Sequence, residues 1–196
     1  MKFKIYNLLF LVLIFMTLYN TANAESEQEQ EYKVKAAFLY NFIKFIDWPS
    51  QKLSDEDAIR IGIIGSNPFG KAFEPVKDKQ IKNKKIGIKL FDSLEQTKLT
   101  VEQITDIRKC HVLFVCRSEV KHFKEILNLT KGYNILTVGD TDGFIESGGI
   151  INFLIEDQKV RFEINNYTAK QAKLNIRSQL LRLAKKVVEK EKKDEN

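Results

Sequence analysis

Short apolar runs alternate with helix-like segments through the middle of the chain, and this alternation constrains the fold more than any other feature. Apolar runs of strand length lie at residues 59–64, 85–91, 110–116 and 134–138. Helices between them are predicted at residues 69–76, 100–107 and 118–129, the last two with Thr100 and Ser118 as N-caps. Strand–helix–strand units pair their strands in parallel through right-handed crossovers. The sequence therefore predicts a single α/β domain.

The C-terminal part predicts antiparallel strands rather than another crossover. Apolar runs at residues 150–155 and 159–164 are separated by a short polar turn, which indicates a β-hairpin. Asn165 or Asn166 can cap a final helical region, and residues 176–188 carry apolar side chains at helical spacing. The expected fold class is α/β, with a mixed, mostly parallel sheet flanked by helices, a C-terminal β-hairpin and a C-terminal helix.

A helix with few charges precedes the first strand. From Val34 to Pro49 the sequence reads VKAAFLYNFIKFIDWP, with its most apolar side chains on one face and further apolar side chains on the opposite face. Pro49 ends the helix, because proline disfavours helical geometry in the residue before it. Two interpretations remain open: the helix is buried within one domain, or part of it forms a dimer or partner interface.

The N-terminus has the pattern of a secretory signal peptide. A basic start is followed by an apolar run of about fifteen residues, shorter than the roughly 20 that span a membrane, and then by Ala22-Asn23-Ala24. We expect residues 1–24 to be a signal peptide cut after Ala24, which places the mature protein in the periplasm. An uncleaved N-terminal anchor is the alternative.

The remaining chain divides by composition into three parts. They are a flexible polar leader at 25–31, an α/β domain at 32–190 and a charged tail at 191–196. Removing residues 1–24 takes two lysines and no acid from a net charge of +6, which leaves +4. Acids alternate with the basic residues along the chain, so no nucleic-acid-binding surface is expected.

The two cysteines, Cys110 and Cys116, lie on either side of the third predicted strand. A strand of six residues spans roughly 20 Å, whereas the Cα atoms of a disulfide are at most about 7 Å apart. They are therefore not expected to bond to each other. Buried unpaired thiols and cross-subunit or redox-active thiols both remain open.

No motif in the chain specifies a reaction. The glycines at 62, 65 and 70 lack the spacing of a dinucleotide or phosphate loop, and Gly70-Lys71 is followed by Ala72. His111 lies in an apolar strand, where a hydrogen-bonded core histidine is favoured over a metal ligand. A loop contains the carboxylates Asp140, Asp142 and Glu146, for which turn formation is favoured over a site. No catalytic residue, cofactor or metal is expected.

Several segments, taken together and in order, resemble the YfiR-like family of bacterial periplasmic proteins. They are VKAAFLYNFIKFIDWP, IGIIGSNPFG, CHVLFVCRSE, ILTVGDTDGFIESGGIINFLIEDQKVRFEIN and LNIRSQLLRLAKKV, between residues 32 and 188. The resemblance implies a Rossmann-like sheet without nucleotide binding, and a homodimer. It also implies repression: the protein binds the periplasmic sensor region of an inner-membrane diguanylate cyclase and keeps cyclic-di-GMP and biofilm formation low. Envelope or reductive stress would release the cyclase. The well-studied repressor has two intramolecular disulfides, whereas this chain has two cysteines in all.

The sequence thus favours a non-enzymatic regulator that acts by protein contact. Aromatic and arginine side chains are favoured at interface cores. The candidates for partner or dimer contacts are Tyr40, Phe45, Trp48, Phe144, Glu146, Arg177 and Arg182. The alternative is a periplasmic receptor domain for a small ligand that serves a sensor or transport system. Its pocket would lie at the strand ends near Ser66, Asn67, Asp140 and Phe144.

Overall fold

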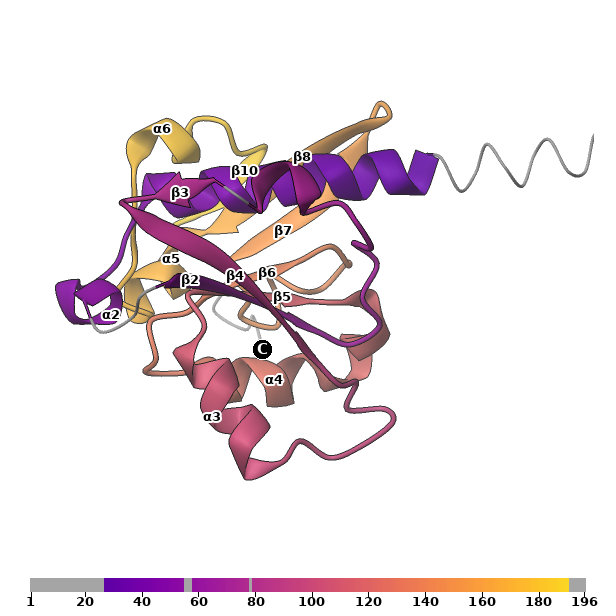
Figure 1. Ribbon diagram of the computed structural model, residues 1–196. Coiled ribbons are helices and arrows are strands. Elements are labelled where there is room, and N and C mark those ends of the chain that lie inside the picture. The colour runs from indigo at the N-terminus through magenta and orange to yellow at the C-terminus, as the bar shows by residue number, and fades with distance from the viewer. Residues whose placement is uncertain (1–26, 55–57, 78, 191–196) are drawn as a thin grey trace, which may run out of the picture.

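The structure, a computed structural model, describes residues 27–54, 58–77 and 79–190 and has three layers (Figure 1). The middle layer is an eight-stranded sheet. In sheet order its strands are β10 (Lys186–Val188), β8 (Lys159–Asn165), β7 (Ile151–Glu156), β6 (Leu136–Gly139), β5 (Val112–Val115), β2 (Ala58–Ile64), β4 (Lys84–Phe91) and β3 (Gln80–Ile81). A helix at residues 27–45 covers one face, and α3 (Val101–Lys109) and α4 (Phe123–Thr130) cover the other.

The strand directions confirm the predicted fold class. Strands β2, β4, β5, β6 and β7 are mutually parallel, β8 runs antiparallel to β7, and β3 runs antiparallel to β4. The hairpin turn between β7 and β8 has positive φ at both Asp157 and Gln158, as a tight two-residue hairpin requires. The sheet is therefore mixed and mostly parallel.

Two separate apolar cores lie on the two faces of the sheet. Alternate residues of β5 face opposite sides: Val112 and Phe114 join the core under the N-terminal helix, and Leu113 and Val115 join the core under α3 and α4. All four are fully buried, as in a strand that is covered on both faces.

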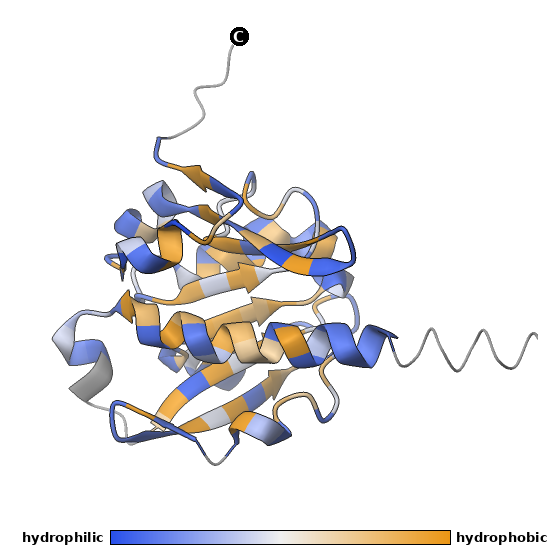
Figure 2. Cartoon of the chain, turned by 90° about the horizontal axis from the view of Figure 1, so that it is seen from above, coloured by the Kyte–Doolittle hydropathy of each residue, from blue (hydrophilic) through white to orange (hydrophobic). Residues whose placement is uncertain are grey.

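The buried face of the N-terminal helix is not its most apolar face, because Val34, Phe38 and Phe45 on the most apolar face are only half-buried. Ala36, Leu39, Phe42 and Ile43 on its inner side, and Ile46 directly after its end, are at most 1% exposed. The Phe42 ring packs on the rings of Phe153 and Phe162 from the hairpin, with centroids 5.6 and 5.1 Å away. Figure 2 shows this helix lying over the strands, with hydrophobic and hydrophilic residues in turn along it.

Both ends of this helix differ from the prediction. Residues 27–31, assigned to a flexible leader, are its first helical turns. It ends at residue 45, before Pro49, because Ile46 and Asp47 form strand β1 (Ile46–Asp47) and pair with β9 (Asn175–Ile176). The signal peptide, its cut after Ala24 and the tail at 191–196 lie outside the described residues.

Two other predicted helices are shorter than expected. Residues 69–76 form turns and the 3-10 helix η1 (Glu74–Val76), where Pro75 lies near the start. Residues 118–129 divide into the 3-10 helix η2 (Arg117–His122) and α4. Ser118 is not the predicted cap, because it lies inside η2 and accepts a hydrogen bond from the Ser66 amide. By contrast, Thr100 caps α3 through a capping box with Gln103, as predicted.

The single helix expected at 176–188 is wrong. The chain after β8 forms α5 (Asn166–Gln171), β9, α6 (Ser178–Leu181) and finally β10, which pairs in parallel with β8. The edge of β8 offers unpaired backbone groups to this segment, and strand pairing there replaces helix hydrogen bonds. Asn165 caps α5 by accepting from the Thr168 amide, as expected.

A short helix, α2 (Ser50–Ser54), connects β1 to β2. No helix among the described residues is long and apolar enough to cross a membrane.

Candidate functional site

A buried ion pair joins the N-terminal helix to the carboxyl edge of the sheet. Asp140 follows β6 directly, and its Oδ2 accepts hydrogen bonds from Lys35 Nζ at 2.6 Å and Tyr32 Oη at 2.7 Å. The Lys35 side chain is 2% exposed and the Asp140 side chain 0%. Burial and the adjacent Asp140 charge raise the pKa of the Tyr32 hydroxyl, so Tyr32 remains a donor. This side chain of Asp140, assigned by sequence to a turn, positions the helix.

A second buried carboxylate closes the position where Rossmann-like sheets bind phosphates. Strand order reverses between β2 and β5, and ligands bind such folds outside the strand ends at this point. Here Glu119, 0% exposed, accepts from Ser93 Oγ at 2.6 Å, from the Leu94 amide at 2.9 Å and from Ser118 Oγ at 2.7 Å. A Cβ on Gly65 would lie 2.4 Å from Ser118 Oγ. The protein's own carboxylate therefore occupies the donors that a phosphate would need.

The pocket expected for a small ligand at the strand ends is not formed by its predicted residues. Ser66 and Asn67 are exposed and line a cavity of about 270 Å³. Asp140 is held in the ion pair, and Phe144 is 0% exposed with its ring 5.1 Å from that of Phe123 in the α3–α4 core. These four residues line no common pocket. Phe144 is also unavailable as a contact residue in this conformation, so that expectation is wrong.

The interface candidates at the end of the N-terminal helix do lie together. The Arg177 backbone amide donates to the Phe45 carbonyl at 3.0 Å, and an Arg177 guanidinium nitrogen donates to Asp47 Oδ1 at 2.7 Å. This hydrogen bond holds the pKa of the Asp47 carboxyl below its ordinary value. Phe45 is half-buried, whereas Trp48 is 7% exposed and packs edge-on against His111. Trp48 therefore belongs mainly to the core.

The other candidates are dispersed. Tyr40 is half-buried on the N-terminal helix, with Lys44 and Lys79 over its ring at 4.2 and 5.6 Å. Glu146 is exposed in the loop before β7, and Arg182 is exposed at the C-terminal end of α6.

The outer side of the N-terminal helix is only partly covered by the described chain. We call it the outer stripe; it consists of Val34, Ala37, Phe38, Asn41 and Phe45, which share a face at helical spacing. Ala37 and Asn41 are exposed and the other three are half-buried. Most of these residues line a shallow depression of about 360 Å³. Sequence reasoning identified this helix and left open whether part of it forms an interface, but of these five residues it named only Phe45 as a contact candidate.

The two thiols face opposite cores. Cys110 lies in the α3–α4 core and Cys116 in the core under the N-terminal helix, with β5 between them. Both are buried and unpaired. Burial raises the pKa of each thiol to about 12, so neither forms a reactive thiolate near neutral pH. This geometry agrees with the prediction that they cannot bond to each other.

His111 is a hydrogen-bonded core residue, as the sequence favoured. Its Nδ1 accepts from the Arg60 amide at 3.1 Å, so its Nε2 carries the proton that faces the Lys52 carbonyl at 3.1 Å. Burial, together with the positive charge of Lys52, lowers the pKa of His111 to about 4. Among the described residues no group of three or more His, Cys, Asp or Glu side chains could hold a metal ion.

Fold and site together define an α/β domain with a Rossmann-like sheet whose phosphate position is filled by Glu119. The chain belongs to the YfiR/HmsC-like family (DUF4154), whose sequence model it matches over residues 32–185. This is a family of periplasmic regulatory proteins. No curated protein matches the chain.

Solved structures resemble the chain in fold alone. A conserved domain protein from Vibrio cholerae O1 biovar El Tor is 9% identical with a TM-score of 0.50, covering 78% of this chain and 59% of its own. The ABC domain from Streptococcus pneumonia, solved with L-Trp, is 13% identical with a TM-score of 0.53, covering 82% of this chain and 60% of its own. The chain thus matches about three-fifths of the length of either.

Proposed function

We propose that this protein is a periplasmic, non-enzymatic regulator that binds the periplasmic sensor region of an inner-membrane signalling protein and represses it. The expected partner is a diguanylate cyclase, so that binding keeps cyclic-di-GMP and biofilm formation low. The observation that carries this proposal is the match to the YfiR/HmsC-like family across nearly the whole domain. The Glu119 carboxylate at the phosphate position supports protein binding over nucleotide chemistry.

The outer stripe is the surface that we assign to the partner. It combines the half-buried rings of Phe38 and Phe45 with small exposed side chains, and the Arg177–Asp47 ion pair borders its C-terminal end. Aromatic residues and arginine contribute most to protein interfaces. A repressor must bind one state of its target better than another, which a rigid helix fixed to a sheet can do.

Co-purification from membranes tests both the partner and the surface. Wild-type protein should retain a membrane protein with a periplasmic sensor region and a GGDEF domain, and loss of the regulator should raise cellular cyclic-di-GMP. Ala37→Glu/Asn41→Glu places two charges on exposed positions of the outer stripe and should reduce recovery by at least about tenfold. The matched control is Val101→Glu/Leu183→Glu, which changes exposed residues outside the outer stripe and should bind normally.

Three outcomes contradict the proposal: wild type retains no such membrane protein, the outer-stripe variant binds as well as wild type, or the control variant loses binding equally. Thermal unfolding of both variants verifies that they are folded. Sedimentation of the purified protein separately tests the homodimer that we expect, and a monomer at micromolar concentration would contradict that part alone.

A further inference from the structure

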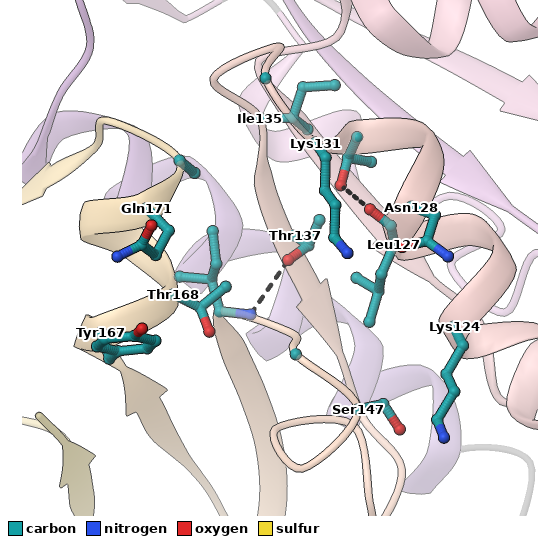
Figure 3. Close-up of a pocket in the computed structure, with 15 residues that line it drawn as sticks. Lys124, Leu127, Asn128, Lys131, Ile135, Thr137, Ser147, Tyr167, Thr168 and Gln171 are labelled. Atoms are coloured by element: carbon teal, nitrogen blue, oxygen red, sulfur yellow. Dashed lines mark hydrogen bonds between the residues drawn. The ribbon is translucent and has the colours of Figure 1, made fainter. Parts of the chain in front are cut away.

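A cavity of about 620 Å³ lies between α4 and α5, and none of the residues assigned above to the outer stripe or to the Asp140 and Glu119 sites lines it (Figure 3). It opens at the amino ends of the parallel strands β6 and β7, whereas Asp140 and Glu119 lie at the carboxyl ends. Its volume falls in the range of about 300–1,000 Å³ that is typical of small-molecule sites.

The charges around this cavity have one sign. Lys124 and Lys131 line it, and none of the other lining residues is charged. They are seven residues apart along α4 and its C-cap, so they lie on one side of the helix. Figure 3 shows the Lys131 side chain directed into the cavity and the Lys124 side chain directed towards Ser147.

Neither ammonium group is neutralised by a neighbour. Across residues 27–54, 58–77 and 79–190, the carboxylates that form salt bridges pair with other cations, and Lys124 and Lys131 make no salt bridge or side-chain hydrogen bond. Two cations that line one cavity and make no salt bridge create a local positive potential that favours an anion.

The floor of the cavity is apolar and its rim is polar. Leu127, Ile135 and Ile150 are at most 6% exposed and form the floor. Ser147 and Gln171 contribute a hydroxyl and an amide at the rim. The Thr137 hydroxyl fixes one wall by accepting from the Ile150 amide at 3.1 Å. An apolar floor with a few convergent polar groups is the usual composition of a ligand site.

We propose that this cavity binds a small organic anion, namely a carboxylate or phosphate group on a compact apolar body. The anionic oxygens contact the ammonium group of Lys131, which is directed into the cavity, while Lys124 adds positive charge at the rim near Ser147, and the apolar body packs on Leu127, Ile135 and Ile150. The ligand binds at the side of the sheet away from the closed phosphate position, so binding does not require Glu119 to move.

Calorimetric titration of the mature protein tests the site with four probes: phenyl phosphate, benzoate, inorganic phosphate and benzyl alcohol. We expect phenyl phosphate or benzoate to bind with a Kd below about 1 mM, more tightly than either inorganic phosphate or benzyl alcohol. The comparison of phenyl phosphate with benzoate identifies which anionic group is preferred. Affinity should fall as salt is raised, because the ammonium groups are exposed.

Two variants locate the binding. Lys124→Gln/Lys131→Gln should weaken it at least about tenfold, whereas the matched Lys85→Gln/Lys159→Gln, which removes two exposed charges elsewhere, should not change it. Gln171→Trp keeps both lysines and should abolish binding by filling the cavity.

The proposal is overturned if no anion binds wild type more tightly than about 10 mM, or if benzyl alcohol binds as tightly as phenyl phosphate and benzoate. It is equally overturned if the apolar body adds nothing over inorganic phosphate, or if Lys124→Gln/Lys131→Gln binds as wild type. These results are independent of the membrane partner, which uses the outer stripe.

Discussion

Two buried carboxylates at the same edge of the sheet are stabilised in different ways. Glu119 accepts from two hydroxyls and one backbone amide, which belong to the segments that follow β4 and β5. Asp140 instead accepts from a cation and a phenol that both lie on the N-terminal helix, more than 100 residues away in the chain. Glu119 therefore connects segments that follow strands of the sheet, whereas Asp140 holds a separate element, the N-terminal helix, on the sheet.

The two carboxylates therefore have different structural roles: Glu119 stabilises the sheet itself, and Asp140 holds the N-terminal helix on the sheet. The Glu119 site needs only the segments that follow β4 and β5, both of which pair with β2. The Asp140 site is complete only when the helix that carries the outer stripe is docked, because Lys35 and the stripe belong to the same helix. We expect a change at Asp140 to alter the proposed partner surface, and a change at Glu119 to leave it largely in place.

The largest expected effect comes from removing the cation. Lys35→Met should lower the free energy of unfolding by about 3–5 kcal/mol, because it leaves the Asp140 charge buried without its counter-ion. Urea denaturation measures this loss. The double variant Lys35→Met/Asp140→Leu removes both charges and should recover most of the stability. If Lys35→Met loses under about 1 kcal/mol, the ion pair does not fasten the helix.

The dependence of stability on pH includes a contribution from His111, which has to be separated from the contributions of the two buried carboxylates. Its pKa is lowered to about 4, below the ordinary value of about 6.5, so the unfolded chain binds the proton first as pH falls. Stability from this group is therefore full above about pH 6.5 and declines by about 3 kcal/mol towards pH 4. In this window the denaturation midpoint of His111→Gln should depend less on pH than that of the wild type. An equally steep profile in that variant contradicts the assignment.

A smaller effect is expected at Glu119. Glu119→Gln keeps the shape and one carbonyl acceptor while the Ser93 and Ser118 hydroxyls can rotate to accept, so a loss of about 1–2 kcal/mol is expected. The same urea denaturation applies, with membrane-partner recovery as a second measurement that should remain close to wild type. A loss as large as that of Lys35→Met would remove the contrast between the two carboxylates.

The smallest effect is expected at the exposed pair that borders the outer stripe. Arg177→Gln removes an ion pair whose members are both nearly half exposed, so the melting temperature should change by no more than about 2 °C. Any change should disappear in high salt, because exposed pairs are screened. A larger or salt-resistant change would mean that the pair, and not only Lys35, holds the helix end.

The strands were predictable because each is specified by its own residues. The run IRIGII and the buried VLFV segment show their apolar character locally, and the hairpin turn at Asp157-Gln158 follows from flanking alternation. The helix predicted for residues 176–188 was wrong because the prediction used only the spacing of apolar residues within that segment. The pairing of β10 with the edge of β8 cannot be recognised from the segment alone. Propensity is overridden where another strand offers hydrogen bonds.

The site was less predictable than the fold. Lys35 was visible as a charge in a helix with few charges, but its partner lies 105 residues further on, and no spacing rule connects the two. Phe144 was expected to be a contact residue because it is aromatic, yet its ring packs inward, where glycines leave room for it: a Cβ at Gly149 would lie 2.2 Å from the ring. Side-chain direction in a loop depends on such close approaches and not on the polarity of its neighbours.

The long separation between Lys35 and Asp140 has a consequence for biogenesis. If export proceeds from the amino terminus, the N-terminal helix reaches the periplasm well before the strand that supplies its counter-ion. During that interval its apolar inner side, which includes Phe42 and Leu39, has no sheet to pack against. We therefore expect the emerging polypeptide to depend on a holding chaperone until β6 has crossed.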